Sequence, residues 1–457
     1  MARPLAGPEG EVTKLTPQAP PSLVPTLTPG SFGHVARQSG VAVAAQLAGV
    51  LLRFVIAVLI ARLQGASALG LYVLTLTLAS GATLLATAGL DRAATRFVSH
   101  HRGREEGGET LGVLFFTCLV AGGAAAILGA SLYFAAPTLA TWLDHPQLTS
   151  PTRVMAVAIP LLALGQVSRA GLYGFQDVRL AVILEQVVIP GATALLFVVL
   201  YVGRPANSIA AVLAAAVAQS SVGLASWVAV AGRLRRQPTA PVFRVLEWMR
   251  FSVVMWLEQW MFFLVGAVAY AFVARYQDTQ AVGVYASAAR VAALVGLPVL
   301  AVSSVFGPAI SNLAARGDWN RLSDVYARLT WTLLLIGVTG ALVVGGAGRW
   351  VVRAFGPGFS AASAPLLILV VGQVVNCATG PSGLMLAMTG RTGWRLANAS
   401  VAAVSAVGMS WVFVPRWGVT GAAAAGVVAS SVVNVVQVFQ VRHLLGMWAY
   451  ARLSARR

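Results

Sequence analysis

The sequence predicts an all-α integral membrane protein, with about twelve transmembrane helices in two six-helix lobes around a central cavity. Three observations lead to this prediction: the composition is very apolar, apolar runs recur at regular intervals, and the two halves of the chain resemble each other. The chain has 457 residues, of which 58% are hydrophobic and only 10% charged, and its mean hydropathy is +0.79. Because a soluble globular chain carries about 25% charged residues, a protein that crosses the bilayer many times is the class that fits.

The apolar runs are about twenty residues long, which is the length that an α-helix needs to cross the hydrocarbon core of a bilayer. We expect spans at 38–62, 68–93, 110–135, 154–175, 180–202, 206–231, 250–275, 281–311, 326–348, 362–387, 394–415 and 418–441. The connections on the expected outer side are short, so an extramembrane catalytic domain is not expected there.

The segments outside the spans differ in composition. Residues 1–36 are rich in Pro, Thr and Gly and lack the apolar core of a signal peptide, so we expect a disordered cytoplasmic tail. The first six spans form an N-lobe over 37–236, and the last six form a C-lobe over 250–447. The charged, proline-broken connection at 237–249 is the expected cytoplasmic linker, and 448–457 form a basic cytoplasmic tail.

The excess of positive charge indicates membrane topology. A formal net charge of +18 would indicate nucleic-acid binding in a soluble protein. Here Lys14 is the single lysine, and the arginines form short clusters between the apolar runs. Most of them fall in alternate connections, and the positive-inside rule then places both termini in the cytoplasm. We therefore expect the lipid bilayer as a partner and no nucleic acid.

A weak internal repeat relates the two halves. The stretch "ALGLYVLTLTLASGATLL" of the second span resembles "AVGVYASAARVAALVGLP" of the eighth, with Gly70 and Tyr72 matching Gly283 and Tyr285. "PLLALGQV" of the fourth span resembles "PLLILVVGQV" of the tenth. Both matches superpose one six-span unit on the other. Duplicated halves are a recurring transporter plan, with the substrate site at the interface between them.

Two arginines lie inside the expected spans, one in each half. Arg53 shares a helix face with Gln46 and Gly49, and Arg290 shares one with Ser287. Counted along their helices, both arginines fall in the outer half of the membrane. An anion between the lobes would meet both, so we predict Arg53, Arg290 and Gln46 as substrate-binding residues. The alternative is that each arginine pairs with a structural carboxylate or reaches a lipid headgroup.

One carboxylate lies well inside the seventh span. Glu258 sits among Trp256, Gln259 and Trp260. A buried carboxylate can bind H⁺ or Na⁺ and couple its movement to transport, or it can serve as the structural counter-ion of an arginine. Apart from such a coupling ion, we expect no cofactor.

The stretch "GLDRAATRFVSHHRGREEGGE" marks the expected cytoplasmic end of the second span and its loop. Its arginines fix the orientation of the chain and meet anionic lipid. Alternatively, Asp91, Arg92 and Arg96 form an inner gate, in which Asp91 or Arg92 pairs with the other lobe across the mouth. Asp91 and Arg92 are adjacent and so should not face each other on a helix, whereas Arg92 and Arg96 share a face.

The sequence shows no catalytic motif. It contains no P-loop, no HExxH and no GxSxG, and its histidines have no partners that would complete a triad. Cys118 and Cys377 both lie in apolar runs, with neither disulfide nor zinc spacing. We therefore predict a transporter, with no catalytic residue and no metal site.

The chain resembles a known family. Its twelve-span pattern, its arginine-bearing first helix, the segment "ALGLYVLTLTLASGATLLATAGLDRAATRF" and the basic loop after it are similar to those of polysaccharide-lipid flippases of the Wzx type. The resemblance covers about residues 37–447, within a larger group that includes drug/sodium antiporters and lipid II flippases. Arg53 and Arg290 match the kind of cationic cavity residue found in this group.

The resemblance implies a function. It implies a flippase in the bacterial inner membrane that moves a polyprenyl-pyrophosphate-linked oligosaccharide from the inner to the outer leaflet by alternating access. This movement serves the synthesis of cell-surface polysaccharide, and other polysaccharide-assembly membrane proteins are possible partners. Two alternatives remain. The first is a cation-coupled multidrug antiporter of the same superfamily, which needs an acidic residue in the N-lobe cavity. The second is a membrane-embedded glycan ligase or polymerase, which usually needs a sizeable outer loop.

Overall fold

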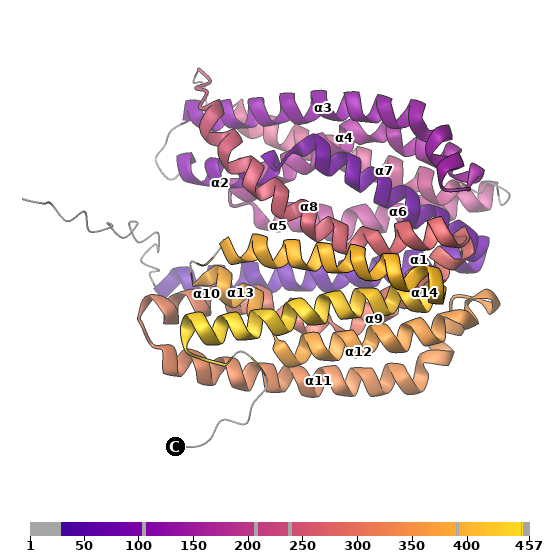
Figure 1. Cartoon of the computed structure of the whole chain (residues 1–457). Coiled ribbons are helices and arrows are strands. Elements are labelled where there is room, and N and C mark those ends of the chain that lie inside the picture. The colour runs from indigo at the N-terminus through magenta and orange to yellow at the C-terminus, as the bar shows by residue number, and fades with distance from the viewer. Residues whose placement is uncertain are drawn as a thin grey trace, which may run out of the picture.

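The computed structural model describes residues 29–102, 107–204, 209–235, 240–389, 391, 393–448 and 450. Every regular element in these residues is helical (Figure 1). The α-helices are α1 (Pro29–Thr87), α2 (Leu90–Arg102), α3 (Gly107–Trp142), α4 (Thr149–Gly174), α5 (Val178–Ile183), α6 (Ile189–Gly203), α7 (Ala210–Leu234), α8 (Val245–Tyr276), α9 (Thr279–Val295), α10 (Leu297–Ala315), α11 (Trp319–Arg353), α12 (Ser363–Thr379), α13 (Ser382–Met388) and α14 (Gly393–Leu445). Three short helices join them: η1 (Pro146–Leu148), η2 (Leu184–Val188) and η3 (Pro357–Ala362).

The longest helices, α1 and α14, each contain two helical segments joined at a glycine. The backbone is non-helical at Gly65 (φ 89°, ψ 178°) and at Gly418 (φ 55°, ψ −130°). Positive φ is accessible to glycine at little cost, and the chain reverses direction at both positions (Figure 1). We call the end of the molecule with these two turns the Gly65 end, and the opposite end, where α2 begins, the Asp91 end.

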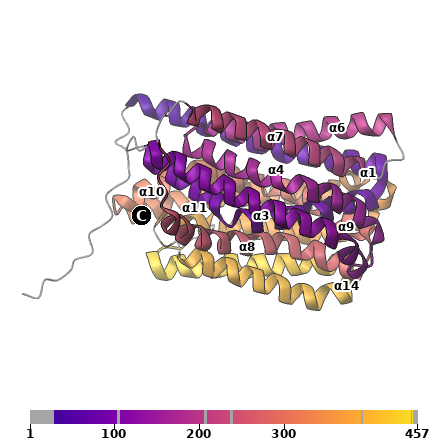
Figure 2. The ribbon, with the colours of Figure 1, turned by 90° about the horizontal axis from the view of Figure 1, so that it is seen from above.

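The helices are long and apolar enough for a polytopic membrane protein. Among the described residues, nine helices could cross a bilayer, or ten if the bent pair α9–α10 (53°) is one span. Both α1 and α14 are counted once here, although the expected spans 38–62 and 68–93 lie on either side of Gly65. The all-helical membrane architecture is thus confirmed, while the count of twelve spans in two lobes stays a prediction. Most helices run roughly along one direction (Figure 2).

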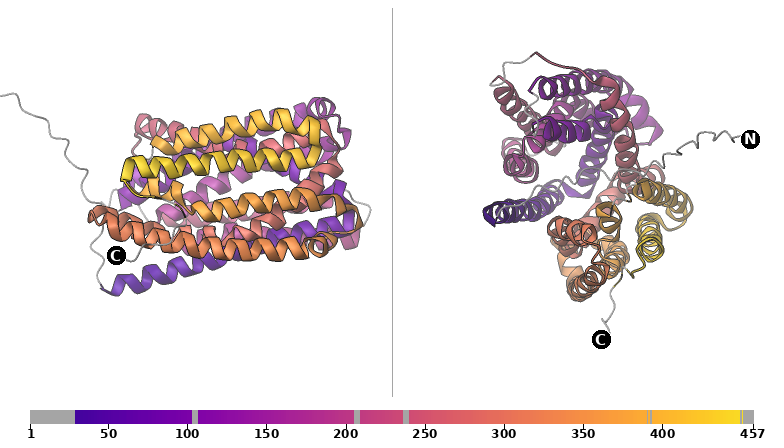
Figure 3. Two further views of the ribbon diagram at one scale, coloured as in Figure 1. Left: turned by 60° about the horizontal axis from the view of Figure 1, so that its bottom comes forward. Right: turned by 90° about the vertical axis from the view of Figure 1, so that its left-hand side faces the viewer.

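The helices fall into two groups separated by a gap in the end-on view (Figure 3). Helices α2–α7 pack mainly with one another, whereas α11–α13 pack with α9, α10 and α14, and α14 also packs closely against α8. Helix α8 crosses from the first group to the second (Figure 1). Its fully buried Trp248 belongs to a core with α2, α3 and α4, whereas Val273 packs with α9 and α14 residues such as Val282 and Ala422.

The segments expected outside the spans are partly helical. Helix α1 begins at Pro29, so residues 29–36, expected in a disordered tail, are helical instead; proline is well suited to a first helical position. Helix α8 begins at Val245 inside the expected linker 237–249, because Trp248 is buried in the core. The expected tails at 1–28 and 451–457 lie outside the described residues.

Contacts of α1 and the α3–α4 connection with α8, α9 and the end of α11 close the Gly65 end. The amide nitrogen Nε2 of Gln147 donates to Oγ1 of Thr279 at 3.0 Å. Nε2 of His145 lies 2.8 Å from the carbonyl oxygen of Ala274, and Nε of Arg62 donates to the carbonyl of Ala354 at 2.6 Å. Arg62 thereby caps the end of α11, where carbonyl groups lack helical partners.

The glycines of the internal repeat meet at this closed end. A Cβ atom on Gly70 would lie 1.8 Å from the carbonyl oxygen of Thr279, and one on Gly283 would lie 2.0 Å from that of Ala66. Both distances are far below a van der Waals contact. The second half of α1 and helix α9, which the repeat relates to each other, therefore pack backbone to backbone, as small residues permit in membrane proteins.

Candidate functional site

The two in-span arginines lie together between the groups of helices. Nη1 of Arg290, on α9, donates a hydrogen bond of 3.3 Å to the backbone carbonyl of Arg53, on α1. Nη1 of Arg53 in turn donates to Oε1 of Gln186 at 2.9 Å. Both arginines are half-buried. Counted along α1 and α9, the two residues lie at similar distances from the closed Gly65 end.

A short π-helical turn supplies the polar partners. The π-helix η2 interrupts the expected span 180–202 and carries Glu185 and Gln186. Single π-turns are rare and often occur at functional sites. Helix α1 comes close to this turn, since a Cβ on Gly49 would lie 2.6 Å from the carbonyl oxygen of Gln186. The close approach places Gln186 within reach of Arg53.

A third arginine joins the cluster from the fourth expected span. Arg169 lies on α4, and the carboxylate of Glu185 interacts electrostatically with both Arg53 and Arg169. Sequence reasoning missed this role. Arg169 and Glu185 both lie near the ends of their apolar runs, where charge ordinarily marks the membrane surface. The signal that could have found them is a pair of polar residues, Glu185 and Gln186, within an otherwise apolar run.

Three cavities surround these residues and share lining side chains. The deep cavity, of about 250 Å³, is lined by Arg53, Ile56, Tyr72, Leu76, Ser80, Arg169, Glu185, Ile189, Pro190, Thr193, Gln219 and Arg290. The middle cavity, of about 260 Å³, is lined by Ser80, Thr83, Leu84, Leu162, Gln166, Arg169 and Gln219. The mouth cavity, of about 550 Å³, is lined by Asp91, Arg92, Thr95, Gln166, Arg169, Ala170, Tyr173, Glu185 and Gln259.

The charge of the lining changes along this series. In the mouth cavity, Arg92 and Arg169 are balanced by Asp91 and Glu185. In the deep cavity, three arginines face the single carboxylate of Glu185. An anion that moves from the mouth to the deep cavity therefore goes from a balanced lining to a positive one, and the low dielectric of the surroundings strengthens this attraction.

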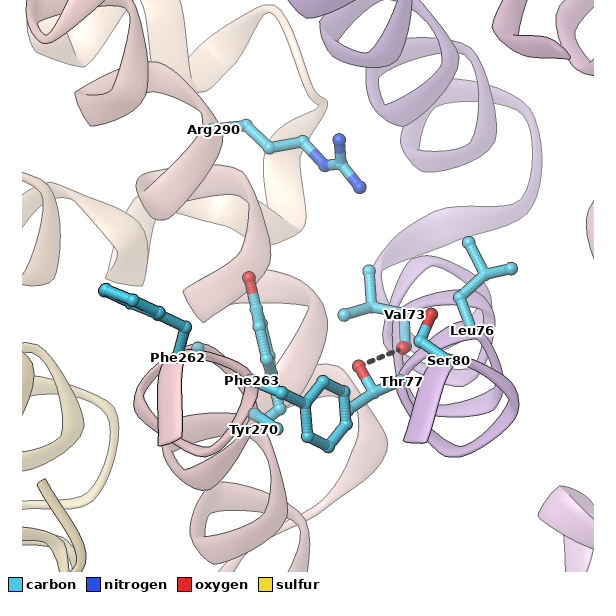
Figure 4. A pocket seen from close by; sticks show the side chains of 10 residues that line it. Val73, Leu76, Thr77, Ser80, Phe262, Phe263, Tyr270 and Arg290 are labelled. Atoms are coloured by element: carbon cyan, nitrogen blue, oxygen red, sulfur yellow. Dashed lines mark hydrogen bonds between the residues drawn. The ribbon is translucent and has the colours of Figure 1, made fainter. Parts of the chain in front are cut away.

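A fourth hollow, which we call the apolar cleft, lies between α1 and α8. It has a volume of about 340 Å³, and Figure 4 shows Arg290 extending above the apolar side chains that line it. These are Val73 and Leu76 from α1 and Phe262, Phe263, Gly266, Ala267 and Tyr270 from α8. Thr77 turns its hydroxyl onto the carbonyl of Val73 at 2.8 Å, so the wall stays largely apolar.

Gln46 and Glu258 do not line any of these four hollows. Oε1 of Gln46 is buried and has no hydrogen-bond partner among the described residues, and a substrate-binding role for Gln46 stays a prediction. Oε1 of Glu258 lies 2.5 Å from Nη2 of Arg395 on α14. This geometry is that of the structural counter-ion, the alternative reading of Glu258, rather than of a coupling site open to the cavity.

The Asp91 end differs from the expected loop. The second span ends at Thr87, because Ala88 and Gly89 adopt positive φ, and the chain continues as the amphipathic helix α2. A Cβ on Gly89 would lie 2.2 Å from the carbonyl oxygen of Ser252, so this break fits closely against α8. Residues 94–102, expected in the loop that follows the span 68–93, are therefore helical.

The three residues of the expected gate have different surroundings. Asp91 is buried and accepts hydrogen bonds of 3.3 Å from Nε2 of Gln166 and from Nε2 of Gln259, the second across to α8. Nε of Arg92 lies 3.9 Å from Oδ2 of Asp91, so these neighbours do approach each other, contrary to expectation, because the long arginine side chain folds back. Arg96 lies instead over the ring of Phe251 at 4.5 Å, away from the mouth cavity.

Comparison with known proteins identifies the family. A family model described as "Polysaccharide biosynthesis protein" matches residues 35–314. The chain belongs to this polysaccharide biosynthesis family. A search of the curated proteins gave no significant match. Membership supports the resemblance to polysaccharide-lipid flippases, since the match begins just before the first expected span and extends through α10.

Solved structures of transporters share the fold of this family member. A multidrug resistance MATE family transporter of the MOP superfamily, in an inward-facing conformation, has a TM-score of 0.73 at 15% identity, with 89% of this chain and 98% of that chain covered. The lipid II flippase MurJ, in an inward closed conformation, has a TM-score of 0.70 at 16% identity, with 87% of each chain covered. An outward-facing MATE transporter scores 0.59 at 18% identity, with 90% and 95% covered.

Family and fold together narrow the class of the protein. This member of the polysaccharide biosynthesis family has the many long apolar helices of a multi-pass membrane protein and shares its fold with a MATE family transporter and with the lipid II flippase MurJ.

Proposed function

We propose that the protein moves a polyprenyl-pyrophosphate-linked oligosaccharide from the inner to the outer leaflet of a bacterial cell membrane. The observation that carries the proposal is the convergence of Arg53, Arg169 and Arg290 on one cavity between the two groups of helices. A diphosphate cannot cross hydrocarbon unaided, and fixed guanidinium groups compensate its charge with strong, charge-assisted hydrogen bonds.

The hollows suit the three parts of such a substrate. The diphosphate fits the positive lining of the deep cavity. The amide side chains of Gln166 and Gln219 in the middle cavity offer hydrogen bonds to sugar hydroxyls. The first isoprene units of the tail fit the apolar cleft below Arg290, while the rest of the tail stays in lipid.

Alternating access accounts for the direction of movement. The mouth cavity at the Asp91 end would receive the substrate from the cytoplasmic side, with both termini in the cytoplasm. The contacts at the Gly65 end would then break as those at the Asp91 end tighten, so that the two groups of helices rock about the site. Asp91 of α2 and Gln259 of α8 both line the mouth cavity and share a hydrogen bond, so we assign the inner gate to this place. Assembly proteins of the same polysaccharide would accept the delivered substrate.

The multidrug antiporter is the alternative that the fold allows. Such an antiporter needs an acidic cavity to bind cationic drugs. In this protein, arginines outnumber carboxylates in the deep cavity. An uptake assay with cationic dyes separates the two functions, because a flippase of this kind should not extrude them.

Charge reversal tests the proposed site. In a strain that lacks its own flippase, Arg53→Glu and Arg290→Glu should each abolish surface polymer, because a carboxylate in the deep cavity repels the diphosphate. Arg96→Glu is the matched control, since Arg96 lies outside the cavities, and it should support export. Surface polymer is measured by immunoblotting, with membrane levels of each variant checked in parallel. Full export by both cavity variants would exclude the assigned role.

A further inference from the structure

Glu185 is an acidic residue in a site that otherwise favours anions. It lines both the mouth cavity and the deep cavity, and Arg169 is the one other residue that lines both. An anionic headgroup that passes from the mouth to Arg53 must therefore pass this carboxylate. A site built only to hold a diphosphate would have no use for a negative charge at this position.

The backbone around Glu185 is specialised to present it there. In a regular helix, neighbouring side chains point about 100° apart. Gln186 accordingly reaches Arg53, while Glu185 lines the cavities. Both side chains stand on the π-turn Leu184–Val188, and such turns are rare and frequent at functional sites.

The contacts of Glu185 leave it able to move. Its Oε2 accepts a long hydrogen bond of 3.4 Å from the hydroxyl of Tyr173, and its Oε1 accepts one of 3.3 Å from Nε2 of Gln186. Its interactions with Arg53 and Arg169 are electrostatic. By contrast, Glu258 lies 2.5 Å from its arginine. Glu185 is thus placed between cations by weak neutral donors.

We propose that Glu185 is an internal anion that substitutes for the substrate's diphosphate when the cavity is empty. Without it, three half-buried arginines would face one another in a low-dielectric site, which is costly. An arriving diphosphate competes with this carboxylate for the positive field of Arg53 and Arg169, and the carboxylate helps to expel the diphosphate after reorientation. The inference rests on the proposed function. It adds that Glu185 lowers the affinity of the site for the diphosphate, so that the substrate can be released.

Binding and transport should respond to Glu185 in opposite directions. The purified full-length chain in lipid nanodiscs is titrated with farnesyl diphosphate, a short polyprenyl diphosphate. Glu185→Gln keeps the shape and hydrogen-bonding groups but removes the charge, so it should bind at least about tenfold more tightly than the wild type. Transport of the full substrate in vesicles should become slower, because release is impeded.

The controls separate this inference from the proposed function. Glu247→Gln makes the same charge change on the exposed first turn of α8 and should leave binding unchanged. If Glu185→Gln does not accumulate as folded protein, Glu185→Ala replaces it, with the same expected direction. Binding by Glu185 variants that is equal to or weaker than wild-type binding overturns the inference. A wild-type chain that does not bind farnesyl diphosphate overturns the proposed function itself.

Discussion

At the scale of single residues, charge inside an apolar run was the most informative signal. Arg53 and Arg290 were predicted from it, and the structure places them in contact. Arg169 and Glu185 were missed because they lie near the ends of their runs, where charge ordinarily marks the membrane surface. Only the packing of α4 and the π-turn against α1 shows that these side chains turn inward.

Glu258 shows where sequence reasoning had to leave two readings open. A carboxylate within a span predicts either coupling or a counter-ion, and the choice depends on a residue more than a hundred positions away. Arg395 supplies that partner from α14. The spacing of the two residues in the sequence does not predict this pairing.

Neutralising the Glu258–Arg395 pair tests which reading holds. Glu258→Gln should lower the free energy of unfolding of the detergent-solubilised protein by about 1 kcal/mol, because Arg395 loses its partner in a partly exposed site. Transport should continue. The double variant Glu258→Gln/Arg395→Gln should recover part of the stability. Loss of transport by stable Glu258→Gln protein would instead indicate a coupling role.

At the scale of elements, sequence predicted the spans better than their breaks. Apolar length identifies where a helix can cross the bilayer, but it carries little information about turns within it. The expected span 281–311 is broken into α9 and α10, and the expected span 362–387 is broken at Gly380, where φ is 59°. Both breaks depend on glycine backbone conformations or packing that a hydropathy pattern does not contain.

The close crossing of α1 and α9 is a second feature at this scale, and it joins two segments that the internal repeat relates to each other. Gly283→Ala should destabilise the protein by about 1–3 kcal/mol, because the new Cβ would meet the backbone of Ala66 and force the helices apart. Gly123→Ala is the matched control, since a Cβ there meets no atom within 4 Å. Thermal unfolding monitored by tryptophan fluorescence compares the two. Equal melting temperatures for both variants would mean that the close crossing does not matter for stability.

At the scale of the whole molecule, composition and periodicity were sufficient for the class and the family resemblance. They could not show which end is closed, since closure depends on contacts between distant segments, such as Gln147 with Thr279. They also could not show that the cavities form a series from a balanced mouth to a positive interior. That series belongs to the assembled helices, and it is the physical basis for proposing an anionic substrate.

Flipping by the purified protein tests this central proposal most directly. Vesicles reconstituted with the wild-type chain and a fluorescent undecaprenyl-diphosphate oligosaccharide should expose the inner-leaflet label to an external quencher at least about tenfold faster than protein-free vesicles. The double variant Arg53→Gln/Arg290→Gln should be no faster than protein-free vesicles, while Arg96→Gln should match the wild type. Flipping by the double variant at the wild-type rate would contradict the account.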